Sequence, residues 1–215
     1  MTTRALFAVV LIPTALLMAW LAARHAMPEQ RPLAAAAQRP IGDVSEFADG
    51  PLRLGGHQAR YVLIEFADFE CPACARAVSA VDSLRLRMGD SLSVVFRHLP
   101  LRGLHPHAFA AALAAECADR QGRFDQMYHV LYSRQAKFDL VPWRQLAGQA
   151  GVPSLADFDA CMSDAALSDR MERERVAAQG LQLDGTPSFV ANGTVLTGVP
   201  SVAALDSLVR SRKQR

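Results

Sequence analysis

The chain has 215 residues, of which 51% are apolar and 20% are charged, and its formal net charge is +2. This composition excludes a disordered chain and suits one globular domain behind a short N-terminal segment. The charges are scattered except for a basic tail at residues 210–215, and no basic stripe follows a predicted element. Nucleic acid is therefore not an expected partner.

The N-terminal residues 5–23 (ALFAVVLIPTALLMAWLAA) carry no charged side chain, and Thr14 is their one strongly polar residue. Their number approaches the roughly 20 residues that a helix needs to span a bilayer, and it exceeds the apolar core of most signal peptides. We therefore expect residues 1–23 to be an uncleaved signal-anchor in the membrane. The alternative is a signal peptide cleaved near residues 34–37, which would leave a soluble protein. Both interpretations predict export.

Residues 24–50 contain Pro28, Pro32 and Pro40 together with a run of alanines, and they show no amphipathic period. Such a composition is typical of an extended connection, so we expect a linker here. The pattern changes at residues 61–66 (YVLIEF), which form a near-continuous apolar run. This run predicts a strand that is covered on both faces.

A helix is predicted directly after Cys71, because Pro72 suits the first helical position and the following apolar residues recur at helical spacing. These apolar residues are Cys74, Val78, Val81 and Met88. Residues 91–100 (SLSVVFRHLP) are the next strand candidate, which Pro100 ends. Strand, helix and strand make a β-α-β unit, in which the two strands pair in parallel.

Residues 101–180 show helical patterns, because their apolar side chains recur every three or four positions. Ser154 with Asp157 resembles a capping box, in which a side-chain oxygen accepts a hydrogen bond from the backbone three residues later. We therefore expect about 80 residues of helices after the β-α-β unit.

Strand signals return near the end of the chain. Residues 188–191 (SFVA) and 194–198 (TVLTG) flank Asn192-Gly193. Asn-Gly supplies the positive φ angles that a type I′ turn requires, so these residues predict a hairpin. A last amphipathic helix is expected over residues 201–209.

Cys71 and Cys74 form a C-x-x-C motif, which serves as a structural clip, a metal site or a redox pair in different proteins. As a clip, the motif closes too small a loop to constrain the unfolded chain. A tetrahedral metal ion needs more ligands, which His98, His105 or His107 would have to supply, whereas two soft thiolates suffice for Cu(I). We favour the redox pair over a metal site.

The predicted position of Cys71 at the start of a helix favours redox chemistry. Unpaired N–H groups and the helix dipole stabilise a negative sulfur there by about 0.3–2 kcal/mol, which lowers the pKa of a cysteine by roughly one unit. We expect the Cys71 sulfur to be exposed and to attack. Cys74 lies one turn inside the helix, so we expect it to be shielded and to resolve the mixed disulfide.

The segments IEFADFECPAC and GTPSFVANGTVLTG resemble the thioredoxin superfamily. The helices between the two sheet-forming parts resemble its DsbA-type branch of exported thiol:disulfide oxidoreductases, and the resemblance covers residues 51–212. It implies an α/β thioredoxin fold with an inserted helical domain. The thioredoxin-fold domain would comprise residues 51–100 and 181–215, and the insertion residues 101–180.

The resemblance also implies roles for individual residues. Cys71 and Cys74 match the redox pair of the family, which needs no other cofactor. Thr186 and Pro187 match a loop in which family members hold a cis proline beside the disulfide, and the residue before the proline pairs with an extended substrate peptide. Glu65 matches a buried acidic residue near the second cysteine that accepts a proton.

The position of Glu65 in an apolar strand supports that role. Burial raises the pKa of a carboxyl group, which would suit Glu65 to accept the proton that Cys74 must lose. A salt-bridged glutamate at a strand edge is the alternative. One residue departs from the family pattern, because the best-known oxidants carry histidine where this chain has Ala73. Because Ala73 cannot supply the positive charge of an imidazolium, we expect Cys71 to be less acidic, and the protein to be a milder oxidant, than in those family members.

These observations predict a thiol:disulfide oxidoreductase that promotes disulfide formation in reduced or misoxidised exported proteins. We expect a monomer in the periplasm or another extracytoplasmic compartment, with a quinone-linked membrane oxidase as redox partner. A reductase or isomerase served by a membrane electron donor is the first alternative. A Cu(I)-binding metallochaperone and a peptide-binding module without catalysis are the others.

Cys117 and Cys161 lie on apolar faces of predicted helices. A disulfide between them is favoured in an exported chain, and closing so long a loop would stabilise the fold by about 4 kcal/mol in the chain-entropy treatment. Two buried free thiols are the alternative. Their distance along the sequence argues against a second catalytic pair.

Overall fold

The computed structural model describes residues 37–41, 47–48, 53–55, 59–183 and 185–211. The predicted membrane segment, residues 1–23, and most of the predicted linker lie outside these residues. In the part of the chain that is described, no helix has the length and hydropathy needed to cross a bilayer.

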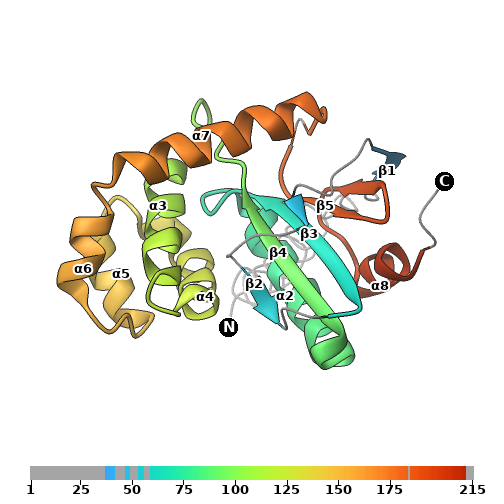
Figure 1. Cartoon of the computed structure of the whole chain (residues 1–215), viewed down its shortest axis with the longest axis horizontal. Helices are drawn as coiled ribbons and strands as arrows, with labels where there is room; N and C mark the ends of the chain where they lie inside the picture. The colour runs from blue at the N-terminus through green and yellow to red at the C-terminus, as the bar shows by residue number, and fades with distance from the viewer. Residues whose placement is uncertain (1–36, 42–46, 49–52, 56–58, 184, 212–215) are drawn as a thin grey trace, which may run out of the picture. The chain divides into compact units, whose positions relative to one another are not determined.

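A six-stranded sheet lies at the centre of the described residues, with the order β1-β6-β5-β3-β4-β2 (Figure 1). Its strands are β1 (Ala37–Pro40), β2 (Arg53–Gly55), β3 (Tyr61–Ala67), β4 (Leu92–His98), β5 (Ser188–Ala191) and β6 (Thr194–Thr197). Strands β3 and β4 pair in parallel, and the other neighbours pair antiparallel. The predicted parallel β-α-β unit is therefore confirmed.

Helix α2 (Pro72–Met88) connects β3 to β4, with a short 3₁₀ turn η2 (Gly89–Ser91) before β4. Cys71 is its N-cap and Pro72 its first residue, as the sequence predicts. The buried face includes Cys74, Val81 and Met88. Val78 is only partly buried. The helical spacing of these residues thus forms one face that packs on the core.

The helical region lies between β4 and β5 in the chain. It comprises α3 (Ala108–Asp119), α4 (Phe124–Arg134), η3 (Gln135–Lys137), α5 (Trp143–Gln149), α6 (Leu155–Cys161) and α7 (Ala165–Gly180). Ser154 caps α6, because its Oγ accepts a hydrogen bond from Asp157 N at 3.2 Å. Helices α3 to α6 gather beside one end of the sheet, and α7 runs back from them toward β5 (Figure 1).

Strands β5 and β6 form the predicted hairpin. Asn192 and Gly193 have φ angles of 52° and 75°, which a type I′ turn requires and asparagine and glycine tolerate. Helix α8 (Val202–Arg210) follows, with the Ser201 hydroxyl accepting from Ala204 N at 3.1 Å. Helix α8 packs beside α2 and against β3 and β5.

Two short strands differ from the sequence expectation. Residues 37–40 fall in the range expected to be a linker, but they form β1, with Ala37 opposite Thr197 and Pro40 opposite Thr194. A proline is compatible with this position because β1 is an edge strand, where one side needs no ladder hydrogen bonds. Strand β2 is three residues long. Strands this short carry too little alternation to be recognised from sequence.

The alternation of β3 decides which of its side chains reach the larger core. Leu63 and Ala67 pack in a core shared with α2 and the inserted helices. Ile64 and Phe66 pack on the opposite face with Leu183, which follows α7. Because successive side chains of a strand point to opposite faces, Glu65 shares the face of Leu63 and Ala67.

Candidate active site

Residues 68–71, here called the active-site turn, connect the end of β3 to the start of α2. Asp68 organises this turn: its Oδ1 accepts from Glu70 N at 2.7 Å, and its backbone oxygen accepts from Cys71 N at 3.1 Å. Its Oδ2 accepts from Leu101 N at 2.9 Å and lies 2.7 Å from His105 Nδ1. The buried carboxylate therefore binds the turn to the segment that follows β4.

The Cys71 residue is 7% exposed, so the prediction that its sulfur is exposed is wrong. The loop before β5 lies against it, with Cys71 Sγ 3.6 Å from Thr186 O. From η3, Gln135 Nε2 donates to Phe69 O at 2.7 Å and to Cys71 O at 3.0 Å. Cys74 is still more buried, at 0% exposure, so the expected order of access to the two sulfurs holds.

The environment of Cys71 lowers the pKa of its thiol from 9.0 to about 5. The largest cause is the hydrogen bond that the Cys74 side chain gives to the Cys71 sulfur. Burial opposes it, and the Thr186 side chain and hydrogen bonds from the backbone of Cys74 and Ala73 lower the pKa further. The direction agrees with the sequence expectation. The shift exceeds the roughly one unit expected from the helix dipole, because a neighbouring thiol contributes.

Burial has the opposite effect on Cys74 and raises the pKa of its thiol well above the ordinary value. Both cysteines are unbonded thiols in this structure. At neutral pH Cys71 is therefore a thiolate and Cys74 a protonated donor to it. This asymmetry distinguishes an attacking sulfur from one that needs a base before it reacts.

The peptide bond between Thr186 and Pro187 is cis. Pro187 O accepts from Gly198 N at 2.9 Å, which ties the loop to the end of the hairpin. Thr186 belongs to this loop and its backbone oxygen faces Cys71. The structure thus brings Thr186 and Pro187 to the cysteine pair from more than 100 residues away along the chain.

Glu65 lies on β3, between β5 and β4, so the alternative of a glutamate at a strand edge is wrong. The residue is 0% exposed. Burial raises the pKa of its carboxyl from 4.5 to about 8, against a smaller lowering by the Tyr128 hydroxyl. That hydroxyl lies 3.5 Å from Oε1 and 3.4 Å from Oε2. Glu65 is therefore protonated at neutral pH and can exchange a proton within the core.

Sequence reasoning missed three residues that shape the site: Asp68, Tyr128 and Gln135. Asp68 stands inside the motif that carries the cysteines, and an aspartate three residues before a helix N-cap could have been recognised as a turn former. Tyr128 lies in the region predicted to be helical, where apolar spacing gives it no role beyond packing. Its contact with Glu65 spans 63 positions of sequence, and no local pattern indicates it.

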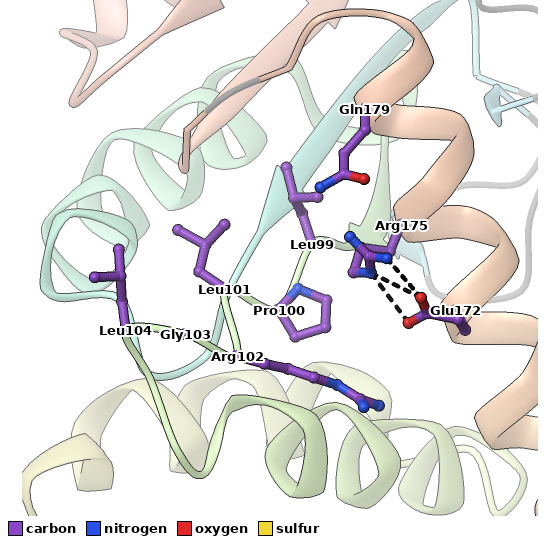
Figure 2. A pocket seen from close by; sticks show the side chains of 9 residues that line it. All are labelled: Leu99, Pro100, Leu101, Arg102, Gly103, Leu104, Glu172, Arg175 and Gln179. Carbon is purple, nitrogen blue, oxygen red and sulfur yellow. Dashed lines mark hydrogen bonds and ion pairs between the residues drawn. The ribbon is translucent and has the colours of Figure 1, made fainter.

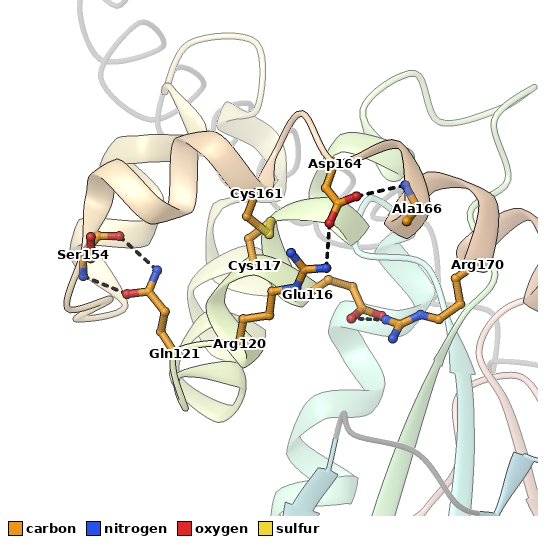
Figure 3. The surroundings of a disulfide bond; sticks show 9 residues. All are labelled: Glu116, Cys117, Arg120, Gln121, Ser154, Cys161, Asp164, Ala166 and Arg170. Carbon is orange, nitrogen blue, oxygen red and sulfur yellow. Dashed lines mark hydrogen bonds and ion pairs between the residues drawn. A yellow bond between two sulfur atoms is a disulfide. The ribbon is translucent and has the colours of Figure 1, made fainter.

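Cys117 of α3 and Cys161 of α6 form a disulfide, with their Cα atoms 5.7 Å apart (Figure 3). Polar contacts beside the disulfide join the same helices to their neighbours. Arg120 pairs with Asp164 at 2.8 Å, and Gln121 Nε2 donates to Ser154 O at 2.9 Å. This second cysteine pair therefore connects helices of the inserted region.

Glu116, next to Cys117, extends this connection to the sheet. Its carboxylate pairs with Arg170 of α7 (Figure 3). It also lies 3.4 Å from His98 Nε2 at the end of β4. Glu116 is buried, and the neighbouring His98 and Arg170 lower the pKa of its carboxyl against the effect of burial. A buried carboxylate of this kind is stable only because both partners stay in place.

A cavity of about 380 Å³ lies between residues 99–104 and α7 (Figure 2). Arg175 and Glu172 form an ion pair on its α7 side, with Nη2 and Oε1 2.6 Å apart. One wall is tied to the active-site region, because Leu99 N donates to Ala67 O at 2.9 Å. Neither Cys71 nor any other site residue predicted from the sequence lines this cavity.

The histidines considered as metal ligands are engaged elsewhere. His98 pairs with Glu116, His105 with Asp68, and His107 with Asp139 at 2.5 Å. Among the residues that the structure describes, no group of three or more histidine, cysteine, aspartate or glutamate side chains could hold a metal ion.

A family model described as Thioredoxin matches residues 48–211. The chain belongs to the thioredoxin family. The match covers strands β2 to β6, the cysteine pair and the inserted helices together. The α/β thioredoxin fold with an inserted helical region, expected from the sequence, is therefore confirmed.

Solved structures of the thioredoxin family show the same fold. A thioredoxin-like oxidoreductase from Silicibacter pomeroyi superposes with a TM-score of 0.66 at 23% identity, over 78% of this chain and 96% of that one. The thiol-disulfide exchange protein α-DsbA2 from Wolbachia pipientis gives 0.65 at 18% identity, over 73% and 84%. A periplasmic thioredoxin-like protein from Salmonella enterica serovar Typhimurium gives 0.63 at 18% identity, over 76% and 91%. These likenesses establish a DsbA-like fold.

Curated relatives at higher identity are much longer proteins. The Na(+)/H(+) antiporter NhaA 1 of Mycolicibacterium vanbaalenii is 36% identical over 152 residues, which are 70% of this chain and 25% of the antiporter. The antiporter NhaA of Herminiimonas arsenicoxydans is 35% identical over 144 residues, 67% of this chain and 22% of that protein. The chain spans about a quarter of the length of these relatives.

Proposed function

We propose that this protein is a thiol:disulfide oxidoreductase that promotes disulfide formation in exported polypeptides through Cys71 and Cys74. The observation that carries the proposal is the pairing of an acidic thiol at the N-cap of α2 with a buried, protonated thiol one turn later. A thiolate stabilised in this way lowers the free energy of the reduced protein. Its disulfide is correspondingly a good oxidant.

The reaction balances as an exchange of one disulfide for another. A substrate thiolate attacks Cys71 of the Cys71–Cys74 disulfide, and Cys74 leaves as a thiolate that takes a proton from Glu65. The second substrate thiol, as its thiolate, then attacks the substrate sulfur of the mixed disulfide. Cys71 leaves as a thiolate. The substrate is oxidised by two electrons, and the cysteine pair of the enzyme is reduced by two.

The loop of Thr186 and Pro187 is suited to hold the polypeptide during this exchange. It lies against the Cys71 sulfur and continues into β5, so its backbone is next to the sulfur that forms the mixed disulfide. An extended substrate segment would pair with this backbone as a strand pairs with a sheet edge. The substrate class that follows is an unfolded or misoxidised polypeptide with accessible cysteines.

The apolar residues 5–23 and the likeness in fold to a periplasmic protein support a location outside the cytoplasm. In such a compartment the reduced pair must pass its electrons to an oxidant, and a quinone-linked membrane oxidase is the class of partner we propose. Residues 1–23 would hold the protein at the membrane, or would be removed as a signal peptide. We propose that the enzyme acts as a monomer.

The test is oxidative refolding of a reduced secreted ribonuclease by the oxidised protein, together with a redox titration in glutathione buffers. We expect refolding to be lost in Cys71→Ser. In Cys74→Ser, the Cys71 thiolate should attack a disulfide of the oxidised substrate, release one substrate thiolate, and accumulate as a mixed disulfide that cannot be resolved. An oxidase should have a reduction potential closer to about −120 mV than to about −270 mV.

Refolding activity retained in Cys71→Ser would overturn the proposal. A potential near about −270 mV, with the pair found reduced by alkylation in cells, would instead establish the reductase alternative. Stoichiometric Cu(I) retained by the reduced protein and lost on replacing either cysteine would support the metallochaperone.

A further inference from the structure

The Glu65 carboxyl has one hydrogen-bonding side chain among the described residues, and it comes from the inserted helical region. Tyr128 of α4 places its hydroxyl 3.5 Å from Oε1 and 3.4 Å from Oε2, so it faces both oxygens. Tyr128 is 0% exposed. Its ring packs edge-on against Phe96 and Tyr132, with centroids 5.8 Å and 4.9 Å away. Packing on two sides leaves the hydroxyl little freedom to turn away from the carboxyl.

The remaining charged and titratable groups around Glu65 come from α2 and α4. Asp82 and Arg85 of α2 and Tyr128 of α4 act on the Glu65 carboxyl. Cys74 of α2 and Glu65 both act on the hydroxyls of Tyr128 and Tyr132 on α4. Its register partners on β4 and β5 are Phe96 and Phe189, which are apolar. The Asp82 and Arg85 side chains pair with each other at 3.3 Å, so their effects on Glu65 oppose one another. Tyr128 is thus the one group of this set that contacts the carboxyl directly.

We propose that Tyr128 is a positioning residue for the resolving step, in which its hydroxyl holds the Glu65 carboxylate in place to take the proton from Cys74. This inference rests on the proposed function. It assigns the inserted helical region a part in the redox chemistry, because the tyrosine is supplied from α4 and the cysteines and glutamate from the thioredoxin-fold part.

The step concerned is closure of the Cys71–Cys74 disulfide from a mixed disulfide at Cys71. Glu65, as carboxylate, takes the proton of the Cys74 thiol, and the Cys74 sulfur attacks Cys71 Sγ. The bond between Cys71 and the bound thiol breaks, and that thiol leaves as a thiolate. Glu65 ends as the neutral acid, which holds the proton from Cys74. The electron pair of the broken disulfide bond leaves with the departing thiolate.

The Tyr128 hydroxyl donates a hydrogen bond that favours the charged form of Glu65, so it lowers the pKa of the carboxyl. Replacing Tyr128 by phenylalanine keeps the ring and removes the donor. The net value of such a bond corresponds to an upward shift of about 0.4–1 pH unit in the midpoint of the resolving step. At pH 7, which is below the midpoint, the step should slow by about three- to tenfold.

The experiment is stopped-flow reaction of the reduced full chain with dithiobis(2-nitrobenzoate) across pH 5–9. The first equivalent of thionitrobenzoate is released when Cys71 attacks the reagent, and the second when Cys74 resolves the mixed disulfide. The first phase tests the proposed reactivity of Cys71, and the second tests the present inference. In Tyr128→Phe we expect an unchanged first phase and a second phase whose pH midpoint moves upward.

Tyr132→Phe is the matched control, because it loses a hydroxyl from the same helix one turn later, and that hydroxyl has no hydrogen-bond partner within the described residues. Its second phase should be unchanged. In a Glu65→Gln background, Tyr128→Phe should have no further effect on the pH midpoint. Infrared titration of the Glu65 carboxyl, in the parent protein and in Tyr128→Phe, measures the shift in the pKa of this group directly and does not depend on a reaction rate.

The outcomes separate this inference from the proposed function. A first phase lost in the parent protein would contradict the role of Cys71 itself. A pH-dependent second phase that Glu65→Gln removes and Tyr128→Phe leaves in place would overturn the role of Tyr128 alone. An equal change in Tyr128→Phe and Tyr132→Phe would overturn it too, because loss of helix packing would then explain both.

Discussion

Cys71 and Cys74 lie where a strand of the sheet meets a helix, whereas Cys117 and Cys161 lie on two helices of the inserted region. Both pairs are largely buried, so burial alone does not make a cysteine reactive or inert. The Cys71 sulfur has backbone N–H groups of Ala73 and Cys74 and the Thr186 loop around it, and the buried Asp68 carboxylate holds the turn before it. Polar contacts beside the second pair join one helix to another.

The chemistry of each cysteine therefore depends on the groups around its sulfur. At the N-cap of α2 the surroundings stabilise a thiolate at Cys71, and a stabilised thiolate is a good leaving group in disulfide exchange. Cys117 lies in the last turns of α3, and Cys161 is the last residue of α6. Neither of these cysteines therefore stands at the start of a helix. The surroundings of Cys71 and Cys74 suit disulfide exchange, whereas the Cys117–Cys161 disulfide holds helices α3 and α6 together.

The largest expected effect concerns the ease of reducing the two disulfides. In graded thiol buffers, the Cys71–Cys74 disulfide should be reduced at a potential at least about 100 mV more positive than the Cys117–Cys161 disulfide, which is more than a thousandfold in equilibrium constant. Alkylation of new thiols followed by peptide mass spectrometry measures both in one sample. Equal potentials would remove the distinction between the pairs.

The next effect comes from removing the second pair. Replacing Cys117 and Cys161 together by alanine should lower the free energy of unfolding by about 4 kcal/mol, because the unfolded chain loses a long closed loop. Chemical denaturation measures this value, and the rate at which Cys71 reacts with an alkylating reagent should be unchanged. The comparison would fail if the stability stayed the same while the reactivity of Cys71 fell.

The smallest effect concerns the pH dependence of stability. The carboxyl of Glu65 has a folded pKa of about 8 against 4.5 as the ordinary value, so its contribution to stability is complete below pH 4.5 and is lost as the pH rises through 8. Glu65→Gln does not titrate. Between pH 5 and pH 9 the oxidised parent should therefore lose about 2–4 kcal/mol more stability than oxidised Glu65→Gln.

The oxidised form is used for this measurement because neither Cys71 nor Cys74 titrates in it. Glu172→Gln is the control, since this glutamate on α7 is half-exposed and an ion pair at the surface contributes little. Its stability should change with pH as the parent does. A parent and a Glu65→Gln variant with parallel pH profiles would show that the carboxyl is not held neutral in the fold.

Much of the fold could be predicted because the decisive patterns are local. The apolar run of β3, the proline after Cys71 and the Asn-Gly of the hairpin each act through backbone conformation and side-chain spacing within a few residues. The position of Glu65 in an apolar strand likewise indicated a raised pKa. Strand β1 could not be found this way, because its pairing with β6 joins segments more than 150 positions apart.

The β-α-β unit, the helical insertion, the hairpin and the placement of Cys71 at a helix N-terminus follow from the sequence, because hydrophobic periodicity and capping depend on neighbouring residues. Three contacts appear only in the folded chain: Thr186 against Cys71, Asp68 with the segment after β4, and Tyr128 with Glu65. These contacts join distant segments. Their geometry follows from how the helices pack on the sheet, which no local pattern specifies.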